Sequence, residues 1–183
     1  MLQGIIISAF MLLFSASVAG QNKADAEGIR WLTIEQAMTM SAQNPKPIMI
    51  DFYTDWCGWC KKLDQTTYSD ADVIEYINTH FYSVKFNAEQ TDDITFLGKA
   101  FSFVPSGKRG THEFASLMAN RNGRIGYPTI TFLTANGTRI AAEGGYKDPI
   151  KMKPLIKYYA EGYYLTMNYQ EFLTAQAEQI SAD

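Results

Sequence analysis

The segment IMIDFYTDWCGWCKKL, residues 48–63, decides how the rest of the chain is interpreted. It begins as an apolar, β-rich run and leads directly into Cys57 and Cys60, each of which follows a tryptophan. These two residues are the only cysteines among the 183 residues of the chain. Such a pair can be half of a zinc site, a structural disulfide or a redox centre, and the surrounding sequence must separate the three.

Zinc and a structural crosslink are both poorly supported. A structural zinc site usually has four ligands, whereas the only histidines, His80 and His112, belong to different predicted segments and have no partner at ligand spacing. No bound metal is therefore expected. A disulfide between cysteines two residues apart closes almost no loop, so it would restrict the unfolded chain very little. The redox interpretation is favoured.

The pair is predicted to lie where a strand ends and a helix begins. Residues 47–53 are β-rich and bounded by breakers, which predicts a buried central strand. Residues 60–69 then read as a helix. Cys57 would lie at the N-terminus of that helix, where unpaired N–H groups and the helix dipole favour a thiolate. Cys60 would lie one turn further in, within reach of a mixed disulfide on Cys57.

The remaining pattern alternates helices and strands and predicts an α/β fold with a mixed sheet. Thr33 and Gln36 form a capping box at the start of a helix. Asn136–Gly137 is a strong hairpin turn between two β-rich runs. Pro154 is expected to disturb or delay the start of a helix within 148–164. The other predicted elements are helices over 69–81, 111–123 and 168–180 and a strand over 81–89.

Residues 91–110 are less regular, and the pattern predicts a short helix with a loop rich in proline, glycine and basic residues. We expect this segment to form a flap or ledge near the cysteine pair. Its aromatic residues, Phe96, Phe101 and Phe103, would either bind a partner or pack locally, and packing is the favoured interpretation.

The first twenty residues differ from the rest because they contain no charged side chain. An apolar run over 5–14 is followed by small residues, which predicts a secretory signal peptide over 1–20 and an exported protein, periplasmic or secreted. An uncleaved anchor is less favoured, because the apolar run is shorter than the roughly 20 residues of a membrane span. Residues 21–30 read as a flexible lead-in. The formal net charge of -3 argues against a nucleic-acid partner.

The segment 48–63 resembles the active-site segment of the thioredoxin family. Asp51 matches the buried carboxylate of that family, Lys85 in VKFN matches the lysine facing it, and GYPTITFLTANG resembles the strand that begins with a cis-proline, here Pro128. The resemblance covers about 31–161. It implies a thioredoxin-like α/β fold, a central mixed β-sheet flanked by helices, with an insertion at about 91–110 and a C-terminal helical extension over 162–183.

The resemblance also implies a set of catalytic roles. Cys57 would be the attacking thiolate and Cys60 the resolving thiol. Asp51 would help to remove the proton of Cys60, since a carboxylate buried in an apolar strand has a raised pKa and can act as a base near neutral pH. Lys85 would tune Asp51. Without the resemblance, a capped aspartate and a solvent-exposed strand lysine would be the ordinary interpretations.

The substrate would be held around the cysteines. Trp56 and Trp59 are expected to wall the site, although ordinary aromatic packing is an equal alternative for Trp56. Gly58 is expected to allow the tight turn without steric cost. Tyr127 and Pro128 would lie against Cys57 and offer backbone groups to an extended substrate strand.

The resulting hypothesis is an exported thiol–disulfide oxidoreductase that acts on protein disulfides, with a reductase preferred over an oxidase or isomerase. It needs no organic cofactor, but it needs an electron-exchange partner, such as a membrane reductase relay. The dipeptide Gly58–Trp59 replaces the Gly-Pro of cytosolic thioredoxins and influences the direction of electron flow. The alternative is a binding or assembly module, such as a chaperone or metal-delivery factor, that uses the same fold without turnover.

Overall fold

The computed structural model describes residues 28–182. The predicted signal peptide, 1–20, and most of the predicted lead-in lie outside the described residues. In chain order the elements are β1 (Trp31–Leu32), α1 (Ile34–Gln43), β2 (Ile48–Tyr53), α2 (Gly58–Thr66), α3 (Ala71–His80), β3 (Tyr82–Asn87), β4 (Ile94–Phe96), β5 (Lys99–Phe101), β6 (Phe103–Ser106), β7 (Arg109–His112), α4 (Glu113–Met118), β8 (Thr129–Leu133), β9 (Arg139–Gly144), α5 (Pro149–Ala160), a short 3-10 helix η1 (Tyr163–Leu165) and α6 (Tyr169–Ala182).

A five-stranded mixed sheet forms the centre of the molecule, in the order β1-β3-β2-β8-β9. β1 and β2 run parallel to β3, whereas β8 is antiparallel to both β2 and β9. β2 is the middle strand, and its first five residues are buried, as expected for a strand covered on both faces. The predicted thioredoxin-like sheet is therefore confirmed, and β2 delivers the chain directly to the cysteine pair.

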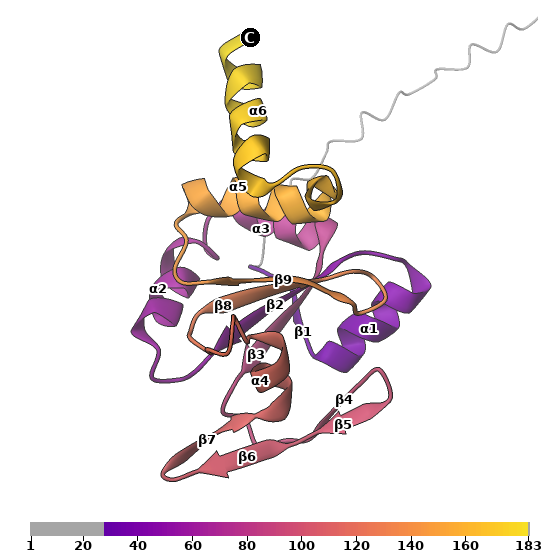
Figure 1. The fold of residues 1–183 in the computed structure, drawn as a ribbon, viewed down its shortest axis with the longest axis vertical. Coiled ribbons are helices and arrows are strands. Elements are labelled where there is room, and N and C mark those ends of the chain that lie inside the picture. The colour runs from indigo at the N-terminus through magenta and orange to yellow at the C-terminus, as the bar shows by residue number, and fades with distance from the viewer. Residues whose placement is uncertain (1–27, 183) are drawn as a thin grey trace, which may run out of the picture.

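Side chains alternate along β2 and feed two separate cores. Ile48, Ile50 and Phe52 belong to the core beside α1 and α4, whereas Met49 belongs to the core beside α3 and α5. Figure 1 shows this layering, with α3 and α5 on one face of the sheet and α1, α4 and the strands β4 to β7 on the other. By the same alternation, the Asp51 side chain lies on the same face of the sheet as that of Met49.

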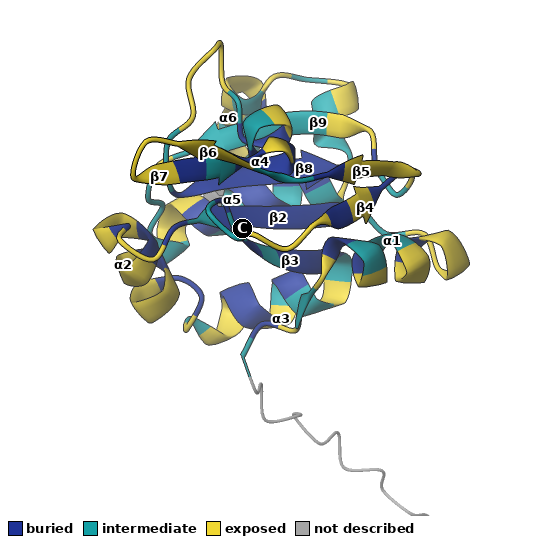
Figure 2. Ribbon diagram, turned by 90° about the horizontal axis from the view of Figure 1, so that it is seen from below, coloured by how far each residue is buried: buried dark blue, intermediate teal, exposed yellow. Residues whose placement is uncertain are grey.

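The segment 91–110 is not a helix with a loop, and that prediction was wrong. It forms two consecutive hairpins, β4–β5 and β6–β7. The first turns at Leu97 and Gly98, which both have positive φ, and the second turns at Gly107, which also has positive φ. Figure 2 shows the hairpins as a partly exposed ribbon across the buried sheet. Two-residue connections with positive φ are typical of tight hairpins.

The β4–β5 hairpin is held by aromatic packing, as the favoured interpretation predicted for Phe96 and Phe101, whereas Phe103 on β6 is only partly buried. Phe96 and Phe101 are buried, and their rings lie 5.1 and 5.7 Å from the ring of Phe114 on α4. Phe52 of β2 also contacts the Phe114 ring, at 5.9 Å. The insertion is thus attached to the sheet through one aromatic cluster.

Helix α4 is shorter than predicted at both ends. Thr111 and His112 continue β7, and the helix starts only at Glu113, because the His112 ring caps it by accepting the Phe114 N–H. The helix ends at Met118, whose carbonyl accepts a hydrogen bond from the Thr131 hydroxyl of β8.

Helix α5 begins at Pro149, and Pro154 neither delays nor breaks it, contrary to prediction. Pro154 has no N–H, so the helix loses one hydrogen bond, to a carbonyl in its first turn. Five buried side chains hold the helix in place despite this loss: Met152, Leu155, Ile156, Tyr158 and Tyr159. The C-terminal helix predicted over 168–180 is present as α6, and Asn168 caps it by accepting the Glu171 N–H.

Candidate active site

The two cysteines form a disulfide at the N-terminus of α2. Cys57 is the N-cap residue, and its Sγ accepts a hydrogen bond from the backbone N–H of Cys60 at 3.0 Å. The predicted placement at a strand–helix junction is therefore present. Cys57 retains 5% of its surface exposed against 1% for Cys60. The sulfur of Cys57 is thus the more accessible of the two to a second molecule, and the helix N-terminus favours negative charge on it.

Gly58 does not have the structural role expected of it. It is the first residue of α2, and a Cβ at this position would meet no atom within 4 Å. Neither close packing nor a positive φ requires glycine here. The expectation that glycine allows a tight turn was wrong, because the turn lies before Cys57, whose N–H bonds to the Thr54 carbonyl.

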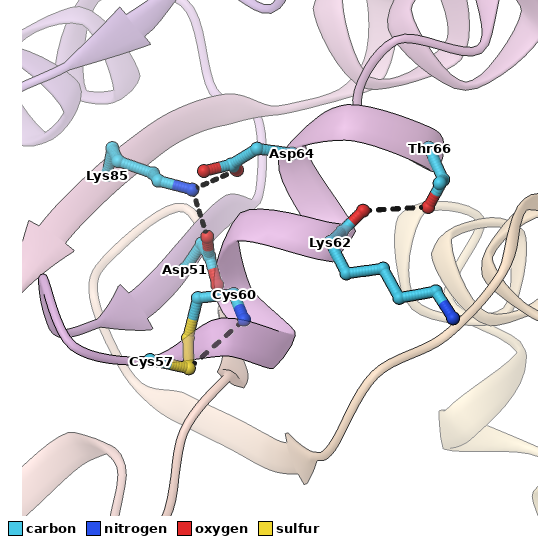
Figure 3. Close-up of polar contacts among 7 residues, drawn as sticks. All are labelled: Asp51, Cys57, Cys60, Lys62, Asp64, Thr66 and Lys85. Atoms are coloured by element: carbon cyan, nitrogen blue, oxygen red, sulfur yellow. Dashed lines mark hydrogen bonds and ion pairs between the residues drawn. A yellow bond between two sulfur atoms is a disulfide. The ribbon is translucent and has the colours of Figure 1, made fainter.

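Asp51 and Lys85 face each other across neighbouring strands of the sheet. They are register partners on β2 and β3, and Lys85 Nζ donates to Asp51 Oδ2 at 2.6 Å. Lys85 also forms an ion pair with Asp64 on α2, so it bridges the two carboxylates. Figure 3 draws the Asp51 carboxylate between this ammonium group and the disulfide. The second oxygen of Asp51, Oδ1, has no hydrogen-bond partner among the described residues.

Burial controls the acid–base properties of this cluster. Asp51 is fully buried, and desolvation raises its pKa above the usual value even though Lys85 opposes the shift. Burial alone would lower the pKa of Lys85, but the two carboxylates outweigh it and the pKa is raised. Lys85 therefore stays charged, and the Asp51 carboxylate beside it takes up a proton more readily than a carboxylate in water does.

Three aromatic rings surround the Lys85 ammonium group. The centroids of Trp31, Tyr53 and Tyr68 lie 5.2, 5.1 and 5.2 Å from its Nζ atom. Burial raises the pKa of Tyr68 well above its usual value, and its hydroxyl has no hydrogen-bond partner among the described residues. These rings exclude water and fix the lysine, so they maintain the low polarity around Asp51.

A groove opens beside Trp59, which lies between the two cysteines in the sequence. The Tyr127–Pro128 peptide bond is cis, as the resemblance implied, and it precedes β8. Pro128 lines a cavity of about 310 Å³ together with Trp59, Tyr127, Gly145 and Tyr146. The Pro128 carbonyl accepts the Gly145 N–H at 2.8 Å, which joins the two segments of the groove floor.

Both tryptophans are half exposed, and each packs against a tyrosine. Trp56 and Trp59 retain 52% and 58% of their surface exposed. Trp56 packs edge-on against Tyr127 at 6.1 Å, and Trp59 packs against Tyr146 at 5.6 Å. Trp59 and Tyr146 therefore line the cavity directly, whereas Trp56 supports its lining residue Tyr127 from outside.

Several groups at the site were not predicted. Lys62 lies 5.1 Å from the Trp59 ring and 5.2 Å from the Tyr146 ring, and the Tyr146 hydroxyl bonds to Thr66 at 2.9 Å. Figure 3 shows Lys62 and Thr66 extending from α2 on the side away from Lys85. Tyr146 could have been found, because it directly follows two glycines near the end of the second hairpin strand.

The insertion supplies another unpredicted contact. The guanidinium group of Arg109, at the start of β7, lies 4.6 Å above the Trp56 ring. The expected ledge near the cysteines therefore consists of the β6–β7 hairpin alone. The β4–β5 hairpin is bound at α1 instead, where the Thr95 N–H donates to Glu35. No local sequence pattern indicates a contact between segments so far apart in the chain.

Within residues 28–182, no three His, Cys, Asp or Glu side chains come together as a metal site would need. In the same described part of the chain, no helix is both long and apolar enough to cross a bilayer.

The chain belongs to the family of thioredoxin-like domains, since the family model for this domain matches residues 34–160, well over half of the chain. Its cysteine pair, cis-proline and buried Asp51 lie within that match.

Among curated proteins, the chain is similar to the thiol:disulfide interchange protein DsbD from two organisms. The identity is 44% over 43 residues for the Photorhabdus laumondii protein, which is 24% of this chain and 7% of that protein. It is 31% over 108 residues for the Yersinia pestis protein, which is 58% of this chain and 14% of that protein. The chain therefore spans only a small part of these relatives.

Among solved structures, a Bacteroides thetaiotaomicron protein provisionally described as a disulphide isomerase is 26% identical, with a TM-score of 0.50, and 72% of this chain matches 93% of it. A thioredoxin-fold protein from Helicobacter pylori has a TM-score of 0.54 at 18% identity, with 73% of this chain and 81% of that one covered. The second likeness concerns the fold alone.

Proposed function

We propose that the protein is a thiol–disulfide oxidoreductase that reduces disulfide bonds in other proteins. The observation that carries this proposal is the placement of Asp51, a fully buried carboxylate with one unpartnered oxygen on the strand that leads to the Cys57–Cys60 pair. A buried base near a resolving thiol accelerates the step that releases the reduced substrate.

The proposed reaction starts from the dithiol form of the pair. The Cys57 thiolate attacks one sulfur of the substrate disulfide, that S–S bond breaks, and the leaving thiolate takes up a proton. Asp51 then accepts the proton of the Cys60 thiol. The resulting thiolate attacks Sγ of Cys57, forms the Cys57–Cys60 disulfide and expels the second substrate thiolate. Two electrons pass from the pair to the substrate.

The reductase direction is supported by the charges buried next to the pair, which neutralise each other and so add little to the stability of a thiolate beyond the effect of the helix N-terminus. A disulfide is strongly oxidising when its reduced form is stabilised. Besides lying at the helix N-terminus, Sγ of Cys57 accepts a single hydrogen bond from the described residues, that of the Cys60 N–H. The nearest charged pair, Asp51 and Lys85, is internally neutralised. Such a site favours the disulfide form and therefore a reductase.

Turnover requires a dithiol donor that reduces the Cys57–Cys60 disulfide again. We propose that the protein acts outside the cytoplasm and that this donor is a membrane electron-transfer protein. The apolar stretch over 1–20 supports export, and the match to a short part of long thiol:disulfide interchange proteins supports a relay. Mass spectrometry of the protein from fractionated cells tests the location. A chain that keeps residues 1–20 in the cytosolic fraction would contradict it.

An insulin-reduction assay with dithiothreitol as the electron donor tests the activity. The wild-type protein should accelerate reduction, Cys57→Ser should abolish the acceleration, and Cys60→Ser should accumulate a mixed disulfide with the substrate. A binding or assembly module without turnover predicts a different result. In that case neither substitution would change insulin reduction or substrate binding, and the proposed function would fail.

A further inference from the structure

Four cationic side chains lie around the groove beside the disulfide: Lys62, Arg109, Arg121 and Lys147. Within residues 28–182, none of the four has a carboxylate within 4.0 Å, whereas Lys85 and Lys153 are each paired with two. Cations without a carboxylate partner are available to a ligand at the groove.

Lys62 supplies the charge on the α2 side of the groove. Its Nζ lies over both aromatic rings of that wall, at 5.1 Å from Trp59 and 5.2 Å from Tyr146. Two rings hold the ammonium group at the rim without neutralising it, because a cation–π contact leaves the charge in place.

Arg121 and Lys147 supply charge beside Gly144 and Gly145. The guanidinium group of Arg121 lies flat on Gly144, where an added Cβ would be 2.0 Å from its Cζ. Lys147 Nζ donates to the carbonyls of Gly144 and Gly145, at 3.0 and 3.4 Å. Gly145 itself lines the groove. Burial lowers the pKa of Lys147, the charge of Glu143 opposes that shift, and Arg121 adds to it. Two like charges strengthen the attraction for an anion, and Glu143 offsets part of this attraction at Lys147.

Arg109 adds a fourth charge from the insertion. It lies on Trp56, which also contacts Tyr127 of the groove. Three acidic residues belong to the same region, and one of them, Asp55, directly precedes Trp56. Glu143 accepts a hydrogen bond from Tyr159, and Glu89 contributes, after burial, to raising the pKa of Tyr127 to about 12. With four cations against three carboxylates, the surroundings of the groove carry a positive balance although the chain carries a net charge of -3.

We propose that this groove selects acidic polypeptide substrates, in which aspartate or glutamate residues flank the cysteine whose disulfide is reduced. The aromatic walls would stack on the extended segment, and the four cations would bind its carboxylates. This inference rests on the proposed function and names the substrate class of the same site. The inference also gives the insertion a role, because its Arg109 adds to the charge that attracts the substrate.

The test compares three peptide disulfides that differ only in the residues flanking one cysteine: two glutamates, two glutamines or two lysines. The wild-type protein, in its dithiol form, reduces each peptide under single-turnover conditions at low and high salt. We expect the acidic peptide to react about tenfold faster than the neutral peptide at low salt, because electrostatic steering reaches that size or more. Added salt should remove most of this ratio.

Two charge variants provide the matched comparison. In Lys62→Gln/Arg121→Gln, the ratio of acidic to neutral rates should fall severalfold towards one. In Lys46→Gln/Lys157→Gln, which removes the same charge away from the groove, the ratio should remain as in the wild type. If both variants lower the ratio equally, net charge and not the groove is responsible, and the inference is wrong.

The wild-type rates distinguish this inference from the proposed function. Equal rates for all three peptides at low salt would overturn the substrate class and leave the oxidoreductase activity standing. If no peptide is reduced, the proposed function and the inference fall together. Since these measurements use the unmodified protein, they decide the question even if a charge variant does not fold.

Discussion

Asp51 combines complete burial with a hydrogen bond to only one of its two oxygens. Its raised pKa has a consequence for stability. The folded state binds the proton more tightly than the unfolded chain, so the contribution of Asp51 is greatest below about pH 3.8 and is lost as the pH rises through the folded-state pKa. At neutral pH the ionised carboxylate therefore makes the folded state less stable than a neutral side chain would.

Asp51→Asn should accordingly be more stable than the wild type at pH 7, and the difference should shrink as the pH falls towards 4. Urea unfolding at a series of pH values measures this. A variant that is less stable at pH 7 than the wild type would show that the ion pair with Lys85 outweighs the cost of burial.

The same substitution should slow catalysis. Without the carboxylate, the Cys60 thiol loses its proton acceptor, and the resolving step should slow by about a hundredfold at pH 7. The loss should diminish at high pH, where the thiol ionises unaided. Acid quenching and mass spectrometry of the mixed disulfide report this step. Unchanged kinetics would show that Asp51 has only a structural role.

At the scale of elements, the hairpins of the insertion depend on the aromatic cluster around Phe114. Phe101→Ala should lower the free energy of unfolding by about 3 kcal/mol, because it leaves a cavity under β5. Val104→Ala, at an exposed position of β6, should change it by less than about 0.5 kcal/mol. Denaturant titration measures both. Equal small effects would mean that the hairpins are not fastened to the core.

The elements also show why the sequence revealed some features and not others. The β8–β9 hairpin was predicted because Asn136–Gly137 is a recognisable turn, whereas Leu97–Gly98 uses a leucine at positive φ, which no propensity favours. The opposition of Asp51 and Lys85 was expected only from the family resemblance. The contact between Arg109 and Trp56 depends on how the insertion folds back, which local patterns do not contain.

At the scale of the whole molecule, α6 packs against α5 far from the disulfide (Figure 1). Phe172 is almost fully buried and contacts Tyr158 and Tyr163, at 5.3 and 4.7 Å between rings. Phe172→Ala should therefore cost about 3 kcal/mol of stability. Insulin reduction, measured at a temperature where the variant stays folded, should match the wild type. A loss of activity in the folded variant would show that α6 contributes to the site.

The measurement that tests the central claim most directly is the reduction potential of the Cys57–Cys60 pair, obtained by equilibration with dithiothreitol redox buffers. A protein-disulfide reductase should have a potential close to that of thioredoxin, about −270 mV. A value near about −120 mV, which is typical of a strong oxidant, would contradict the proposed direction of electron transfer.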